Sequence, residues 1–132
     1  MRTCKTAGQP FGGRAADGPR VTGVVRLPPG APPPAGAIAL RVRLLDVSYQ
    51  DAEAEVVAEQ VIRGAALAGL ADGIPFQLHA GAIDPAATYA VEAHVETRAD
   101  GLIHPGDYLT DQSYPVLTHG APSEVDVEVR PV

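Results

Sequence analysis

Apolar and polar side chains alternate with a period of two along much of this 132-residue chain. The clearest run covers residues 38–44, in which apolar residues at 38, 40, 42 and 44 alternate with Ala39, Arg41 and Arg43. Successive side chains of a strand point to opposite faces, so this run predicts a strand with one core face and one charged face. The adjacent Leu44 and Leu45 predict a β-bulge.

Weaker alternation of the same kind recurs along the chain. It predicts further strands near residues 21–27, 56–62, 74–79, 89–96, 102–117 and 124–130, the run at 102–117 being interrupted. Thirteen Pro and fourteen Gly residues supply the turns that join short strands, which a helical bundle would not need. Seven strands at this spacing predict an all-β fold, an antiparallel two-layer β-sandwich of immunoglobulin-like or Greek-key type.

One segment allows two interpretations. Residues 52–63 are rich in Ala, Glu and Gln, which are good helix formers, yet Val56, Ala58, Gln60 and Ile62 also fall on one face of a strand. We favour the strand. The Gly-rich stretch that follows, at residues 64–73, predicts a loop with a short turn of helix.

The first residues differ in composition from the rest. Residues 1–19 are rich in Gly and have Phe11 as their only large apolar side chain, so we expect a flexible leader before one domain at residues 20–132. A lipoprotein signal places a long apolar run before its cysteine, and only three residues precede Cys4, so we do not expect lipidation there. With a single cysteine, no internal disulfide is possible.

Charge and hydropathy exclude two classes of partner. Residues 1–20 hold four basic groups and one acidic group, whereas the remainder holds six basic and fifteen acidic groups. An acidic domain surface repels phosphate backbones, so we expect no nucleic-acid binding. No run approaches the roughly 18 uninterrupted apolar residues that a membrane span needs, so none is expected.

A proline marks one strand as an edge. Pro75 lies inside the alternating run at residues 74–79, and proline cannot donate to a central ladder. An exposed edge is a site where a partner can add a strand. The candidate partner-binding edge comprises Ile74, Phe76, Gln77, Leu78 and His79.

No pattern indicates an enzyme, a metal site or a cofactor. The four histidines lack the close spacing of zinc ligands, and no serine lies in a nucleophile motif. The carboxylates at outward strand positions are expected to form a solvated polar face with neighbouring arginines; they are Glu92, Glu96, Glu124, Asp126 and Glu128. A small metal-dependent hydrolase using His94, Glu96 and Asp126 is the alternative, and it requires His94 to lie beside Asp126.

Three of the four tyrosines, Tyr49, Tyr108 and Tyr114, fall near predicted loops. A tyrosine hydroxyl that bonds to the backbone at the corner of a sandwich is a known structural device. We therefore expect Tyr114 to be structural, with recognition as the alternative.

Several segments resemble one bacterial family in order along the chain. They are residues 21–25 (Val-Thr-Gly-Val-Val), 40–47 (Leu-Arg-Val-Arg-Leu-Leu-Asp-Val), 58–60 (Ala-Glu-Gln), 74–78 (Ile-Pro-Phe-Gln-Leu), 83–85 (Ile-Asp-Pro), 89–91 (Tyr-Ala-Val) and 114–118 (Tyr-Pro-Val-Leu-Thr). In this order they resemble YbaY-like domains, which belong with the lipoprotein chaperones of type III secretion (YscW-like). The likeness extends from about residue 21 to residue 129.

The resemblance implies a β-sandwich in a bacterial envelope setting, in the periplasm or at the outer membrane. It implies a non-catalytic module that binds another envelope or secretion protein, as pilots of an outer-membrane ring protein do. A purely structural domain is the alternative. The loop at residues 104–107 looks longer than the family pattern, and the resemblance assigns no role to particular residues.

Overall fold

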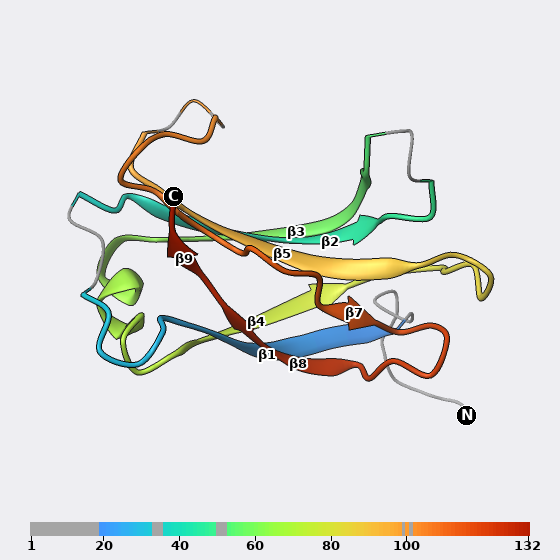
Figure 1. The fold of residues 1–132 in the computed structure, drawn as a ribbon. Coiled ribbons are helices and arrows are strands. Elements are labelled where there is room, and N and C mark those ends of the chain that lie inside the picture. The colour runs from blue at the N-terminus through green and yellow to red at the C-terminus, as the bar shows by residue number, and fades with distance from the viewer. Residues whose placement is uncertain (1–18, 33–35, 50–52, 99, 101) are drawn as a thin grey trace.

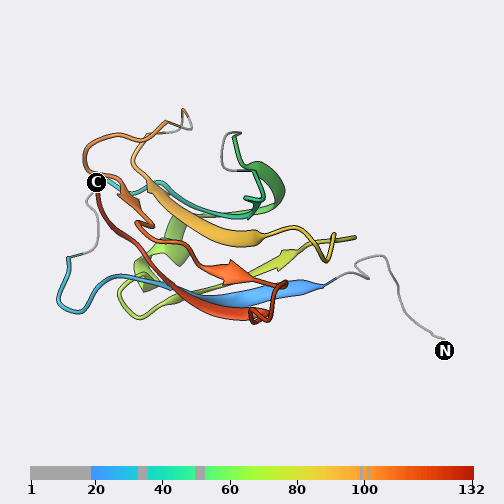
Figure 2. The same ribbon diagram turned by 45° about the vertical axis from the view of Figure 1, so that its right-hand side comes forward.

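Two β-sheets pack face to face in the computed structural model, which describes residues 19–32, 36–49, 53–98, 100 and 102–132 (Figures 1 and 2). The strands are β1 (Arg20–Arg26), β2 (Ala39–Asp46), β3 (Glu55–Arg63), β4 (Ile74–His79), β5 (Tyr89–Glu96), β6 (Tyr108–Leu109), β7 (Pro115–Val116), β8 (Glu124–Glu128) and β9 (Arg130–Pro131). Figure 1 places β1, β4 and β8 in one layer and β2, β3 and β5 in the other. Residues 1–18 of the predicted leader lie outside the described residues, and the leader's last residue, Pro19, is tied to the domain because its O accepts a bond from Ala80 N–H at 2.9 Å.

The sheets differ in size and in strand direction. The smaller sheet has the order β4-β1-β8, and the larger has the order β3-β2-β5-β6-β9, with β7 paired to β5. Every pair is antiparallel except β1 with β8, which is parallel. The all-β two-layer prediction is confirmed, and the described residues form nine strands in place of seven. The extra strands arise because each of the last two predicted runs is divided in two.

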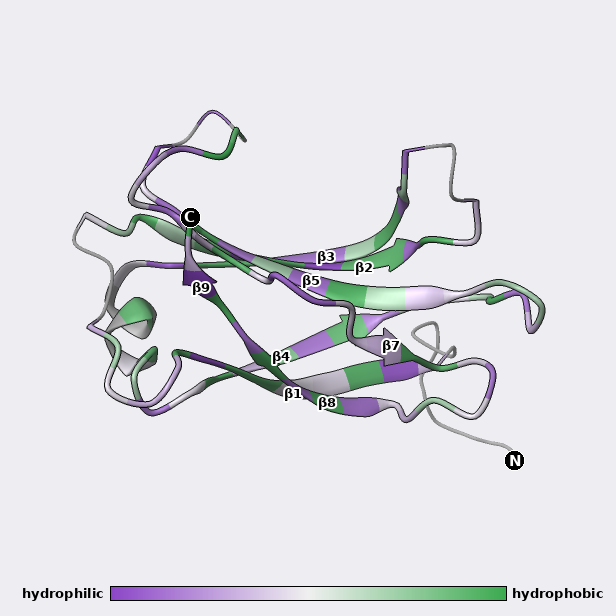
Figure 3. Ribbon diagram, viewed as in Figure 1, coloured by the Kyte–Doolittle hydropathy of each residue, from purple (hydrophilic) through white to green (hydrophobic). Residues whose placement is uncertain are grey.

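The core lies between the facing sides of the sheets. Burial alternates residue by residue along β4, and Figure 3 shows the same alternation as green and purple blocks along β4 and β8. The main buried side chains are Val21, Val25, Leu40, Val42, Leu44, Phe76, Leu78, Val91, Val95, Val127 and Val129. Small branched side chains therefore fill the space that the alternating pattern predicts. Ile38, expected on the core face, precedes β2 and is 42% exposed.

The structure decides the ambiguous segments. Residues 55–63 form β3, so the strand interpretation is confirmed, and a short 3-10 helix at Gly64–Gly69 (η2) follows it. The register between β2 and β3 shifts at Leu44 and Leu45 because Leu44 pairs with Ala58 and Leu45 with Val56. The bulge is at the predicted place, but the extra residue belongs to β3. No helix in the described part of the chain is long and apolar enough to cross a bilayer.

Gly23 allows β8 to approach β1 closely. A Cβ atom at this position would lie 1.7 Å from the backbone oxygen of Val125 in β8 and 3.1 Å from Cε1 of Phe76 in β4. No side chain other than hydrogen fits between these two neighbours. The three-stranded sheet therefore depends on glycine at the centre of its middle strand.

We expect Gly23→Ala to lower the free energy of unfolding by about 2–3 kcal/mol, since β8 must move away from β1 to admit a methyl group. Urea unfolding followed by circular dichroism measures this. Gly69→Ala is the control, because its Cβ would meet nothing closer than Ile74 Cγ1 at 3.9 Å. Equal stabilities for the two variants would contradict the close approach.

Candidate functional site

The predicted partner-binding edge is an edge strand of the smaller sheet, β4. The side chains of Ile74, Phe76 and Leu78 are buried in the core, while those of Gln77 and His79 are exposed. A partner at this edge would therefore meet two polar side chains and the backbone. The three apolar residues offer a partner no side chain, and their main-chain groups face β1.

The backbone of β4 is partly closed on its open side. The N–H of Gln77 faces away from β1, because it donates to Oε1 of Gln60 in β3 at 2.9 Å. Outward groups recur at every second residue, so those of Pro75 and His79 face the same side. Pro75 has no N–H. Among these three positions only His79 therefore offers an added strand an unbonded outward N–H. Use of this edge by a partner stays a prediction.

The opposite edge of the same sheet is β8, and its ladder with β1 fixes which groups face outward. Thr22 N–H donates to Ser123 O at 3.0 Å, and Val129 N–H donates to Arg26 O at 3.1 Å. In a parallel ladder with this register, Val125 and Val127 pair with β1. The N–H and C=O groups of the alternate residues, Glu124, Asp126 and Glu128, therefore face away from β1.

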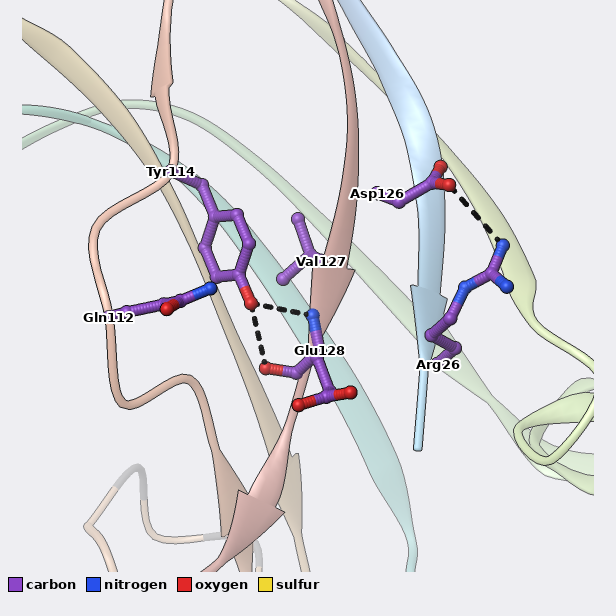
Figure 4. Close-up of a pocket in the computed structure, with 6 residues that line it drawn as sticks. All are labelled: Arg26, Gln112, Tyr114, Asp126, Val127 and Glu128. Atoms are coloured by element: carbon purple, nitrogen blue, oxygen red, sulfur yellow. Dashed lines mark hydrogen bonds and ion pairs between the residues drawn. The ribbon is translucent and has the colours of Figure 1, made fainter. Parts of the chain in front are cut away.

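The outward backbone groups of one of these three residues, Glu128, are already bonded to a side chain. The hydroxyl of Tyr114 accepts a bond from Glu128 N–H at 3.0 Å and donates to Glu128 O at 3.4 Å (Figure 4). Tyr114 is 8% exposed and bridges from the segment before β7 to β8. The expected structural role of this tyrosine is thus seen. Tyr108 also bonds to backbone, at Pro32 O, whereas Tyr49 is 77% exposed.

A cleft of about 300 Å³ lies beside this edge. Its lining residues are Arg26, Gln112, Tyr114, Asp126, Val127 and Glu128. Figure 4 shows Gln112 and Tyr114 on one wall and β8 on the other. Five of the six lining residues carry polar or charged groups, so the cleft is mainly polar and lies beside open backbone and carboxylates.

The acidic side chains of β8 are exposed or half-buried, and their ion pairs are open to solvent. Arg26 Nη2 lies 3.4 Å from Asp126 Oδ2, with side chains 47% and 64% exposed. Arg130 Nη2 lies 2.6 Å from Glu128 Oε1. Exposed pairs of this kind contribute little to stability, so both acids are accessible to other cations.

The solvated face expected around β5 is wrong for Glu96. Glu96 is 1% exposed and the neighbouring His94 is 5% exposed, because Arg41 of β2 bonds to Glu96 and Asp107 bonds to His94. Arg41 holds Glu96 with two bonds of 3.1 and 3.3 Å and reaches Glu59 in β3 at 3.1 Å. These bonds raise the pKa of Arg41, the largest contribution coming from Glu96. The network links three strands.

Asp107 is the buried residue that sequence reasoning missed. It is fully buried, and its carboxylate accepts bonds from His94 Nε2 (2.7 Å), His104 N–H (3.0 Å), Thr97 N–H (3.0 Å) and Thr97 Oγ1 (2.6 Å). The Pro-Gly-Asp sequence signals the local bond to His104. The long-range contact with His94 has no sequence signal.

Hydrogen bonding controls the ionisation of Asp107. Burial favours the neutral acid, but the bonds from Thr97, His94 and the His104 backbone outweigh it and hold the pKa well below its usual range. The carboxylate therefore stays charged and ties the loop between β5 and β6 to β5.

The arrangement does not meet the requirement of the hydrolase alternative. His94 lies in β5 of the larger sheet and Asp126 in β8 of the smaller one, so they are not cross-strand neighbours. Among the described residues, no group of three or more His, Cys, Asp or Glu side chains is placed to hold a metal ion. His104 pairs with Asp100 at 2.7 Å, and His79 and His119 are exposed.

A model of the type III secretion system lipoprotein chaperones (YscW) matches residues 16–129, which is most of the chain. The chain belongs to the YscW family. This confirms the resemblance predicted from the ordered segments. The YscW family is one of chaperones, so the chain is a chaperone-like protein-binding module.

A solved structure supports the same assignment of this YscW-family chain. It is an alternative pilotin from the type II secretion system of Vibrio cholerae. The two sequences are 28% identical, the match covers 86% of this chain and 96% of the pilotin chain, and the TM-score is 0.68. A search of the curated proteins finds no match.

In this YscW-family chain, we expect Asp107→Asn to lower the free energy of unfolding by about 2–4 kcal/mol at neutral pH. The asparagine side chain has one oxygen that accepts hydrogen bonds, and its NH2 group only donates. Some of the donors that bond to the Asp107 carboxylate would therefore be left unpaired. Urea unfolding measures the loss. Asp111→Asn is the control, since Asp111 is exposed and pairs with Arg130 at 3.4 Å.

The same pair of variants tests the lowered pKa of Asp107. Because its pKa is lower in the folded chain than in the unfolded chain, Asp107 stabilises the fold above about pH 4, and this contribution is lost as pH falls further. Asp107→Asn should therefore show a flatter fall in stability between about pH 5 and pH 2 than the unaltered chain. An unchanged slope would mean that Asp107 is not held ionised.

Tyr114→Phe removes the hydroxyl that closes Glu128. We expect a loss of about 1 kcal/mol in the free energy of unfolding and roughly tenfold faster hydrogen exchange at the Glu128 amide. Exchange followed by nuclear magnetic resonance checks both statements. Tyr108→Phe is the control, because its hydroxyl bonds to Pro32 and not to β8. Unchanged exchange at the Glu128 amide in Tyr114→Phe would mean that the Tyr114 hydroxyl does not protect this amide.

Proposed function

We propose that this YscW-family chain is a pilot-like chaperone that binds a segment of the ring-forming outer-membrane subunit of a secretion system and assists its assembly. The observation that carries the proposal is the similarity to a type II secretion pilotin over nearly the whole of both chains. A second support is the match to the secretion chaperone family over residues 16–129.

The surface of the sandwich suits binding better than catalysis. The buried polar residues His94, Glu96 and Asp107 bond to one another or to the backbone and arginine side chains around them, so they serve the fold. Both sheets end in exposed strands, among them β3, β4 and β8. Exposed strands recognise extended or apolar segments of partners.

The test is binding and assembly of the ring subunit encoded in the same genome. We expect the purified chain to bind this subunit with a Kd in the micromolar range or tighter, about −8 kcal/mol, and to increase the yield of assembled ring on co-expression. Calorimetry and native gels measure the two effects. If the subunit neither binds the chain nor assembles better with it, the proposed function is wrong.

The same measurement tests the β4 edge. A double variant, Gln77→Glu with His79→Glu, places two carboxylates on the exposed side of this strand and keeps its buried side chains. If β4 receives the partner, affinity falls by about tenfold or more relative to Glu53→Gln, an exposed change before β3. Unchanged affinity removes β4 from the candidate surfaces.

A further inference from the structure

Two residues of β8 present open backbone groups. The N–H and C=O of Glu124 and of Asp126 face away from β1, and they meet no hydrogen-bond partner among the described residues. Glu128 is the next residue whose backbone groups face outward, and the hydroxyl of Tyr114 bonds to both of them. The open stretch therefore has a defined end, which limits an added strand to the part of β8 before Glu128.

The cleft beside β8 gives an added strand room for its side chains. Side chains of a strand alternate between the two faces of its sheet. On one face they would enter the cleft of about 300 Å³, whose wall opposite β8 carries Gln112 and Tyr114 (Figure 4). On the face that carries the acids they would lie beside the exposed side chains of Glu124 and Asp126, and Asp126 also lines the cleft.

The charge of this face selects the partner. Three acids, Glu124, Asp126 and Glu128, project from one face of β8. Arg26 is paired with Asp126 only through an exposed contact of 3.4 Å, and within the described residues Glu124 has no ion pair. Opposite charges on neighbouring strands stabilise their pairing, whereas like charges oppose it. A cationic strand is therefore favoured over an anionic one.

The other two long edges are less suited. On β4, two of the three outward positions offer no free N–H, because Pro75 lacks an N–H and that of Gln77 is bonded to Gln60. On β3, the register with β2 directs the backbone groups of Glu59 and Val61 outward. The carboxylate of Glu59, however, is already bonded to the side chains of two arginines. β8 alone of these three combines open groups, a neighbouring cleft and accessible charge.

We propose that the open edge of β8 at Glu124 and Asp126 receives an extended segment of the partner as an added strand, and that this segment carries Lys or Arg at alternate positions. The proposal rests on the proposed function and names the surface and the chemistry of the partner segment.

The first experiment uses a capped seven-residue peptide of alternating Lys and Val, with a peptide of alternating Glu and Val as its match. At saturation with the basic peptide, hydrogen exchange at the amides of Glu124 and Asp126 slows by about tenfold or more, since added bonds protect them. The amides of Glu59 and Val61 in β3 keep their rates. Equal binding of the two peptides, or protection at β3 instead of β8, overturns the proposal.

Matched variants separate the backbone from the charge. Asp126→Pro removes an outward N–H that the β1 ladder does not use, Asp126→Ala removes only the carboxylate, and Val61→Pro removes an outward N–H of β3. We expect Asp126→Pro to weaken basic-peptide binding by about tenfold more than Asp126→Ala does, and Val61→Pro to leave it unchanged. Thermal melting confirms that each variant is folded. Equal affinities of Asp126→Pro and Asp126→Ala contradict strand addition.

The full ring subunit distinguishes this inference from the proposed function. If the subunit binds Asp126→Pro as tightly as the unaltered chain, the β8 site is wrong and the pilot function stands. If the unaltered chain binds the basic peptide at β8 but not the subunit, the β8 site stands and the pilot function fails. A dimer of the chain alone that Asp126→Pro dissociates would mean that a second copy covers this edge, which also overturns the proposal.

Discussion

The parallel ladder between β1 and β8 determines what the smaller sheet presents to solvent. Strand β1 uses alternate residues to pair with β4 on one side and with β8 on the other, so its register fixes the outward groups of both edges. Gly23 makes this arrangement possible, because a Cβ there would collide with the backbone of Val125. Which backbone groups face outward at β4 and at β8 follows from this one strand, whereas the partial closure of β4 comes from Pro75 and Gln60.

The alternation of apolar side chains predicted most of the architecture. Pro75 indicated the edge strand β4 because a missing N–H is a local property that the residue type reveals. The place of β8 beside β1 was not predictable in the same way. About a hundred residues separate the paired strands, and alternation states which face is buried without stating which strand is the neighbour.

The polar contacts show the same division between local and distant information. Glu96 and His94 occupy outward strand positions, and their burial depends on Arg41 in β2 and on the segment that contains Asp107. A solvated face was the reasonable prediction for such positions, because carboxylates are rarely buried unless paired. The pairing that reverses this rule comes from residues far apart in the sequence.

Hydrogen exchange in the unbound chain is the measurement that reports whether the backbone groups of the β8 edge are open. We expect fast exchange at the amides of Glu124 and Asp126 and slow exchange at those of Val125 and Val127, which pair with β1. Glu128 should also be slow because of Tyr114. Protection at Glu124 and Asp126 with fast exchange at Val125 and Val127 would mean that the opposite set of groups faces outward, and it would contradict the account.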